Sequence, residues 1–248
     1  MNENIQILNG LFRQSLAATK AACRRERGYK VPGTTLTSPG NVSFSPCWFN
    51  RAYRLSVSTS LRGWPRKPGV RYLREDRDSL CILGAVLSLI HPIAAKRGLA
   101  IMDGIAKGTI KNEATNSLDE ARLVWSSPFT AISIISNRDT ELHRDGKGFA
   151  PFYDLITTVG YYTGGRFEVP GIGLRFQYDS GTIMGLCGKV LGHSVAEVDG
   201  DRFCVVQYFH RKVLEGIHSD FSRHRGISDW MRVQDFIDLV TPEVKLDY

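Results

Sequence analysis

Apolar residues recur at helical spacing over residues 3–27, and their side chains would share one face of a helix. They are Ile5, Leu8, Leu11, Phe12, Leu16 and Ala22. A second helix is predicted to begin after a cap at Asp78 or Ser79 and to run to about Ala95. Pro92 should interrupt it, because proline has no backbone N–H to donate. We interpret the two helices as a layer that supports the rest of the fold.

After residue 120 the pattern changes to short strands separated by turns. The expected strands are ARLVW, FTAISIIS, three strands within DLITTVGYYTGGRFEVPGIGLRFQY that a Gly-Gly and a Pro-Gly turn divide, GTIMGLC, and RFCVVQYF. Strands that follow one another without intervening helices predict an antiparallel barrel or sandwich. A last amphipathic stretch, SDWMRVQDFIDLV, predicts a closing helix within residues 226–242.

The 248 residues are enough to bury a substantial core, and no long linker or internal repeat divides them. We therefore expect one α+β domain over residues 1–248, with helices packed on one face of a double sheet. Residues 1–110 would supply helical and basic supporting elements, residues 120–215 the sheet core, and residues 226–242 the closing helix. A helical domain followed by a strand-rich domain is the alternative.

The charge of the chain is positive and unevenly placed. The net charge is +7, which favours acidic partners such as nucleic acid. From Arg51 to Arg74 there are seven basic residues and no acidic one, with Tyr53, Trp64 and Tyr72 interleaved. This mixture predicts a surface that binds the phosphates of DNA, with a solvated face as the alternative. The residues expected to contact the DNA backbone are Arg51, Arg54, Arg62, Arg66 and Lys67.

The five cysteines form no CxxC pair and are odd in number, so we expect reduced thiols, mostly in the core of an intracellular protein. The longest apolar stretch, Leu80 to Ile90, is too short to cross a bilayer and predicts a buried helix. We expect no membrane partner, and nothing in the sequence suggests an obligate oligomer, so a monomer is expected.

His143 and Asp145 stand two residues apart at the end of an apolar run. If the run is a strand, both side chains lie on one face and can hold one ion; a polar turn is the alternative. His193, between two strand-like stretches, can supply a third ligand. Two histidines and one carboxylate form the facial triad of non-haem iron(II) oxygenases, whose open positions take a co-substrate and oxygen. Zinc accepts similar ligands, so the ligand types alone do not select iron.

Arg202 lies nine residues after His193, on the next expected strand. A fixed cation there can hold the far carboxylate of a dicarboxylate whose keto-acid end chelates the metal. In this ordered set the chain resembles the 2-oxoglutarate- and iron(II)-dependent dioxygenases over residues 120–215. The resemblance implies a double-stranded β-helix (jelly-roll) core with packed N-terminal and C-terminal helices. It also implies that His143, Asp145 and His193 bind Fe(II), that Arg202 binds 2-oxoglutarate, and that O2 is consumed.

Beyond Arg202, alternate positions of the same strand are Cys204, Val206, Tyr208 and His210, which would face one cavity. An aromatic ring and an imidazole suit a flipped nucleobase, because the ring stacks on the base and the imidazole reads its edge. The chain is therefore similar to the TET/JBP branch, as a compact catalytic unit. In that branch an aromatic residue and a histidine lie six and eight residues after the 2-oxoglutarate arginine. The resemblance implies that a nuclear enzyme oxidises 5-methylcytosine in double-stranded DNA to hydroxymethyl-, formyl- and carboxylcytosine.

Three positions refine the resemblance. Arg138, five residues before His143, resembles an active-site arginine of some members, with a surface strand end as the alternative. Cys204 stands where relatives often carry a small hydroxyl, with a core cysteine as the alternative. Relatives commonly have Asp or Asn three residues after the metal Asp, where it accepts from the cytosine amine, but here the residue is Gly148. Asp154 is the nearest downstream carboxylate, and a glycine enlarges the pocket, so we hypothesise that N6-methyladenine is accepted as well.

Other functions stay open. A protein hydroxylase of the prolyl type would also suit the spacing from His193 to Arg202, although Tyr208, His210 and the basic first half argue against it. A non-catalytic DNA-binding module would not need the intact metal and co-substrate positions. A structural zinc site is the fourth possibility. The sequence leaves undecided which methylated base is preferred.

Overall fold

The computed structural model describes residues 3–17, 28–30, 35–49, 55–62, 68–107, 124–150, 152–196 and 198–214. Its helical elements are α1 (Glu3–Ala17), the 3₁₀ turn η1 (Thr59–Leu61), α3 (Pro68–Glu75), α4 (Arg77–Ile90), α5 (Pro92–Ala106) and the 3₁₀ turn η2 (Pro170–Ile172). Its strands are β1 (Gly40–Phe44), β2 (Trp48–Phe49), β3 (Leu55–Ser56), β4 (Ala131–Ser136), β5 (Thr140–His143), β6 (Asp154–Thr163), β7 (Arg166–Val169), β8 (Leu174–Gln177), β9 (Ile183–Leu186), β10 (His193–Val195) and β11 (Asp199–Tyr208).

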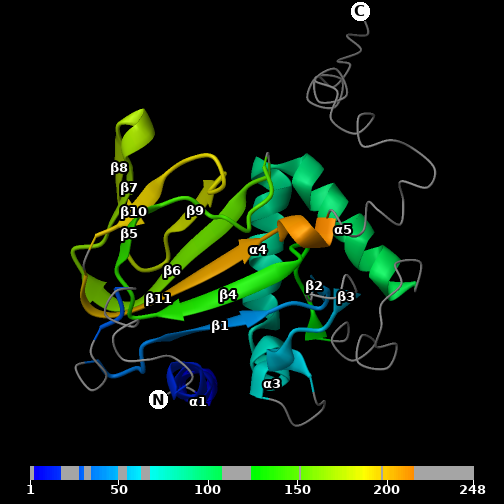
Figure 1. Cartoon of the computed structure of the whole chain (residues 1–248), viewed down its shortest axis with the longest axis horizontal. Helices are drawn as coiled ribbons and strands as arrows, with labels where there is room; N and C mark the ends of the chain where they lie inside the picture. The colour runs from blue at the N-terminus through cyan, green and yellow to red at the C-terminus, as the bar shows by residue number, and fades with distance from the viewer. Residues whose placement is uncertain are drawn as a thin grey trace, which may run out of the picture.

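Two antiparallel sheets form the core. The larger has the strand order β1-β4-β11-β6-β9, and the smaller has the order β5-β10-β7-β8. Side chains of both sheets meet in one buried cluster, with Ile156 and Cys204 from the larger sheet and Phe167 and Val195 from the smaller. The sheets therefore pack face to face, as in Figure 1. This confirms the expected α+β fold with a jelly-roll-like core.

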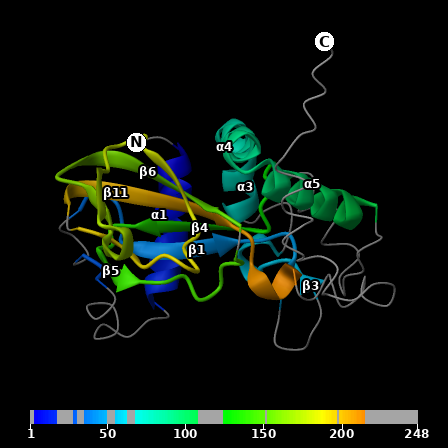
Figure 2. The same ribbon diagram turned by 90° about the horizontal axis from the view of Figure 1, so that it is seen from above.

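The two faces of the larger sheet have different partners, because successive side chains of a strand point to opposite sides. Ile132 and Ile134 of β4 pack on the helical side with Phe12 of α1, whereas Ile135 packs between the sheets. Phe203 of β11 also lies on the helical side, where its ring stacks on that of Phe12. Figures 1 and 2 show α3, α4 and α5 together at the end of the sheet away from β7 and β8. The other face of the sheet is left to line the space between the sheets.

The helical first half departs from the sequence-based expectation. A separate helix, α3, precedes α4, and α4 begins at Arg77 after an N-cap at Asp76, earlier than the predicted cap. Pro92 does not merely interrupt the helix but begins α5, which runs on to Ala106. Proline is favourable at the first position of a helix, since that N–H has no partner within the helix. The Nδ1 atom of His91 accepts from the backbone N–H of Ala94 and caps α5.

Two further predictions were wrong. The run from Leu80 to Ile90 is not buried all round, because Ile82 is 62% exposed and Leu89 is 83% exposed. Val124 and Trp125 of the expected strand ARLVW are not in a strand, and its first three residues lie outside the described part. The other expected strands are present.

Some expectations lie partly or wholly outside the described residues. The closing helix of residues 226–242 is one of them. Among the described residues Cys47, Cys81, Cys187 and Cys204 are free thiols, and Cys23 lies outside. No helix in the described ranges is long and apolar enough to cross a membrane.

Candidate metal centre and substrate pocket

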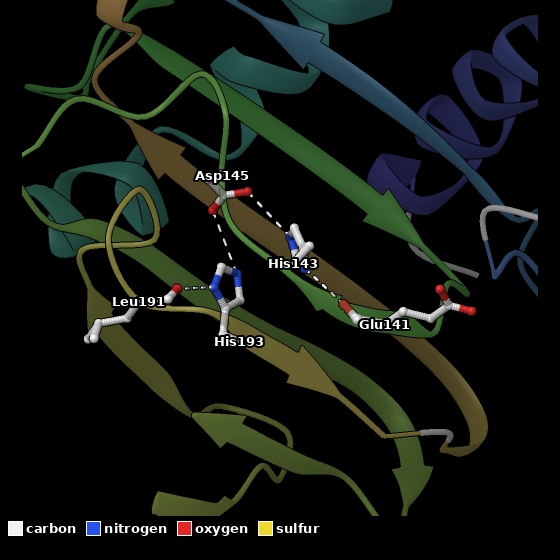
Figure 3. Close-up of polar contacts among 5 residues, drawn as sticks. All are labelled: Glu141, His143, Asp145, Leu191 and His193. Carbon is white, nitrogen blue, oxygen red and sulfur yellow. Dashed lines mark hydrogen bonds and ion pairs between the residues drawn. The ribbon is translucent and has the colours of Figure 1, made fainter. Parts of the chain in front are cut away.

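Three side chains that can bind a metal meet where β5 and β10 pair. His143 ends β5, His193 begins β10, and the two residues are directly opposite in the antiparallel register. Asp145 lies two residues beyond β5, where its backbone N–H donates to the carbonyl of Gly188 at 2.9 Å. One ligand atom from each of the three residues lies within 4.8 Å of the others (Figure 3). The structure thus brings together the triad that the sequence selected.

Backbone carbonyls orient both imidazoles of the triad. Nδ1 of His143 lies 3.0 Å from the carbonyl of Glu141, and Nδ1 of His193 lies 3.1 Å from that of Leu191 (Figure 3). With Nδ1–H donating to these oxygens, each Nε2 keeps a lone pair for a metal. The Nε2 atoms lie 3.4 Å and 3.7 Å from the two carboxylate oxygens of Asp145. Two nitrogen donors and one oxygen donor around one point fit a divalent transition metal such as iron.

Burial and neighbouring charges set the protonation of the triad. The hydrogen bond with Asp145 raises the pKa of His143, whereas burial lowers the pKa of His193. Burial alone would raise the pKa of Asp145, but the hydrogen bond from His143 and the charge of His193 bring it below its ordinary value. At neutral pH the carboxylate is ionised and His193 is neutral, which are the forms that bind a metal.

Arg202 is a buried guanidinium with unused donors. It lies on β11 and is 3% exposed, and its Nη2 donates to the backbone carbonyl of Arg138 at 2.5 Å. Its Nε and Nη1 atoms are buried and have no oxygen or nitrogen acceptor among the described residues. Burying such donors without a partner is costly, so a carboxylate that fits the guanidinium fork is the natural ligand. One carboxylate of 2-oxoglutarate would meet this need.

The surroundings of Arg202 include one residue, Tyr178, that no sequence motif indicated. Cys204 is buried, and its pKa is raised by burial and lowered by the charge of Arg202. Tyr178 is fully buried, and burial and then Cys204 raise its pKa well above the ordinary value. Both side chains are therefore neutral at neutral pH. The Arg138 guanidinium lies 5.4 Å from the ring centre of Tyr29, and its charge lowers the pKa of Asp145.

The residues predicted to meet a base gather near the end of β11. Tyr208 is buried, and its hydroxyl lies 3.4 Å from that of Ser133. His210 follows the strand and is also buried, and its backbone N–H donates to Oγ1 of Thr130 at 2.8 Å. The rings of Tyr208 and His210 are 6.3 Å apart. Val206 packs against the buried cluster between the sheets.

Trp48 of β2 completes this aromatic group, although the sequence did not single it out. Its ring centre lies 5.0 Å from that of His210, with the planes inclined at 55°. The Nζ atom of Lys147 lies 5.8 Å from the centre of the indole. The one sequence signal for a role of Trp48 was that it is an aromatic residue in the hydroxyl-rich segment before the basic run from Arg51 to Arg74. Its approach to His210 depends on contacts between segments that are distant in the sequence.

Gly148 and Asp154 are neighbours in space as well as candidates for reading the base. A Cβ atom on Gly148 would lie 3.2 Å from Oδ2 of Asp154, so this carboxyl occupies the space that the glycine leaves. Asp154 begins β6 and is 3% exposed. Burial, and then the charge of Asp145, raises the pKa of Asp154 to about 8. At neutral pH it therefore keeps its proton and can both donate and accept a hydrogen bond.

Of the residues predicted to hold the DNA backbone, Arg62 is in the described part. Its Nε donates to the carbonyl of Val57 at 2.9 Å, and its Nη2 donates to Oγ of Ser56 at 3.1 Å. Outside the described residues lie Arg51, Arg54, Arg66 and Lys67. Their contacts with DNA stay a prediction.

A comparison with protein families agrees with the geometry of the site. The family model Tet_JBP, the oxygenase domain of the 2OGFeDO superfamily, matches residues 71–211, which is more than half of the chain. The matched range contains the triad and Arg202. None of the curated proteins compared with the chain matches it. A solved structure of NgTET1 in complex with 5mC DNA is similar, with a TM-score of 0.49 and 13% identity over 86% of this chain and 70% of that chain.

Proposed function

We propose, from the premise that this chain belongs to the Tet_JBP family of oxygenase domains in the 2OGFeDO superfamily, that it oxidises the methyl group of 5-methylcytosine in double-stranded DNA. The observation that carries the proposal is the arrangement along β11 and the residues that follow it. Arg202, with its two unused nitrogens, fits a carboxylate, and Tyr208 and His210 further along fit a base. Iron(II) at the triad, with 2-oxoglutarate and O2, would supply the oxidising chemistry.

The residues of the chain would bind, orient and shield. His143, Asp145 and His193 would hold the metal, and Arg202 would fix the co-substrate. The target base would leave the duplex at a cost of a few kcal/mol and stack on Tyr208, while His210 would hydrogen-bond to its edge. Repeated oxidation would give hydroxymethyl-, formyl- and carboxylcytosine. Such a substrate would place the protein in the nucleus.

A second substrate, N6-methyladenine, is favoured by the position of Asp154. Cytosine and adenine both present an exocyclic N–H beside a ring nitrogen acceptor. A protonated carboxyl can donate to that ring nitrogen and accept from the amine, so Asp154 could read either base. Hydroxylation of the N-methyl group gives a hemiaminal that releases formaldehyde, and the net result is demethylation.

The direct test is mass spectrometry of nucleosides after incubation of the full chain with methylated duplex DNA, iron(II), 2-oxoglutarate and ascorbate. We expect oxidised methylcytosine, together with a loss of N6-methyladenine from adenine-methylated DNA. Reactions without 2-oxoglutarate are the control. If neither base changes while a proline-containing peptide becomes hydroxylated, the protein hydroxylase is the correct function. DNA binding without any turnover would instead support the non-catalytic module.

Moving the carboxyl from residue 154 to residue 148 is expected to change base preference. In the double variant Gly148→Asp/Asp154→Ala, the new carboxyl would start where a Cβ lies 3.2 Å from the present Oδ2 of Asp154. We expect the ratio of adenine to cytosine oxidation to fall about tenfold, the size of effect that one lost pocket contact produces. Competition assays with both methylated DNAs would measure the ratio, and Asp154→Ala alone is the control. An unchanged ratio in the double variant would exclude these residues as base readers.

A further inference from the structure

A polar cavity of about 380 Å³ lies beside Tyr208 and His210, the residues proposed to bind the base. Its described lining comes from β1, β2 and the segment around η1, and Figure 1 shows β2 and β3 near the end of β11. The lining residues are Asn41, Val42, Ser43, Trp48, Ser58, Thr59, Ser60 and Arg62. None of these described residues is acidic, and Arg62 brings a positive charge. A cavity of this size is in the range of small-ligand sites.

The cavity adjoins the proposed base pocket through shared side chains. Oγ of Ser43 lies 2.8 Å from Oγ of Ser133, which lies 3.4 Å from the hydroxyl of Tyr208. These hydroxyls come from the paired strands β1 and β4 and from β11, on the face of the sheet away from the helices. Trp48 lines the cavity and also contacts the ring of His210. One indole and one row of hydroxyls therefore lie between this cavity and the residues proposed to bind the base.

The polar groups of the cavity suit a ligand that carries both an anionic group and a hydrogen-bond donor. Arg62 is held by hydrogen bonds to Val57 and Ser56, which use two of its five N–H groups and leave donors for an anion. The Oδ1 atom of Asn41 is buried and accepts no hydrogen bond among the described residues. A buried acceptor without a donor is unfavourable, so a ligand N–H is expected there. A nucleotide offers phosphate oxygens, base N–H groups and a flat ring for Trp48.

We propose that this cavity, the flanking subsite, binds the nucleotide next to the flipped base on the same DNA strand. Its phosphate would meet Arg62, its base would lie against Trp48, and a base N–H would donate to Asn41. This proposal rests on the proposed function in DNA oxidation. Phosphate contacts give affinity without sequence choice, whereas contacts with the flanking base set the sequence context of the reaction. Arg62 and Asn41 should therefore have separable effects.

The affinity test compares Arg62→Ala with Arg71→Ala. Both arginines belong to the same basic run, but Arg71 lies on α3 and forms an ion pair with Glu3 of α1, on the helical side of the fold. We expect Arg62→Ala to weaken binding of methylated duplex DNA about tenfold and to reduce the slope of log affinity against log salt by about one. Arg71→Ala removes the same charge and should leave the slope unchanged. Equal effects of the two variants would mean that general basicity, and not the subsite, binds the phosphate.

The specificity test uses oligonucleotides that differ in the base beside methylcytosine. We expect Asn41→Leu to change the ratios of kcat/KM among the four flanking bases by about fivefold or more, an effect that corresponds to the loss of one hydrogen bond. Arg62→Ala should lower all four values together. Asn41→Leu removes an acceptor that has no partner among the described residues, and unfolding curves should show that it folds normally. Unchanged ratios for Asn41→Leu would overturn the subsite while DNA oxidation by the wild type stands. Failure of the wild type to oxidise DNA would remove the proposed function itself.

Discussion

Replacing Asp145 with alanine is expected to remove iron binding and turnover together. Its carboxylate lies 3.4 Å and 3.7 Å from the Nε2 atoms of His143 and His193, so it is the group that joins the two imidazoles into one site. The variant would keep two neutral donors and lose the charge that binds a divalent ion. Loss of a partner that merely orients a metal ligand costs about 10- to 100-fold in affinity or activity. Loss of the ligand itself should exceed about 100-fold.

Metal content and the anaerobic absorption band of the iron(II)–2-oxoglutarate complex measure the first effect, and nucleoside analysis measures the second. The control is His91→Asn, which removes an imidazole that lies outside the triad. His91 caps α5 by accepting from Ala94, and asparagine is a good N-cap residue that preserves this role. We expect the control to keep iron and activity. Retention of iron by Asp145→Ala would show that the triad is not the metal site.

The strand-rich half of the protein was predictable because its signals are local. The Gly-Gly and Pro-Gly turns mark the connections between β6, β7 and β8, and the alternation of side chains in β11 places Arg202, Cys204 and Val206 on one face. The pairing of His143 with His193 follows from the order of the strands in a jelly roll. The ordered motif is therefore sufficient to identify the candidate metal site.

The features that the sequence did not reveal depend on contacts between distant segments. Trp48 belongs to a hairpin of two-residue strands, and only the folded chain brings it to His210. Tyr178 directly follows β8 and belongs to no sequence motif, yet it is fully buried near Cys204. The pocket space that Gly148 was predicted to leave is occupied by the carboxyl of Asp154. This depends on how the loop that carries Gly148 packs against β6. The spacing of residues along a short stretch of sequence does not predict such contacts between distant segments.

Replacing Asp201 with alanine is expected to lower the free energy of unfolding by about 3 kcal/mol. The reason is that four hydrogen-bond donors would lose the carboxylate that accepts from all of them. Oδ1 of Asp201 accepts from the backbone N–H and hydroxyl of Thr37, at 2.9 Å and 2.6 Å, and from Nδ2 of Asn137 at 3.0 Å. Oδ2 accepts from the backbone N–H of Leu36 at 3.0 Å. Asn137 in turn exchanges hydrogen bonds with the backbone of Arg202, at 2.9 Å and 2.8 Å. The variant should therefore also raise the KM for 2-oxoglutarate.

The pH dependence of stability distinguishes this network from general loss of packing. Burial alone would raise the pKa of Asp201, but the hydrogen bonds from Thr37 and Asn137 bring it below the ordinary value. Its contribution is therefore complete above the pKa of an unfolded aspartate, about 3.9, and is lost as the pH falls through the lower folded pKa. Denaturant unfolding of the wild type and Asp201→Ala should differ most at neutral pH and progressively less in acid. Asp199→Ala, at an exposed position of the same strand, is the control. A difference that stayed constant into acid, or an equal loss in the control, would show that the carboxylate network does not hold Arg202 in place.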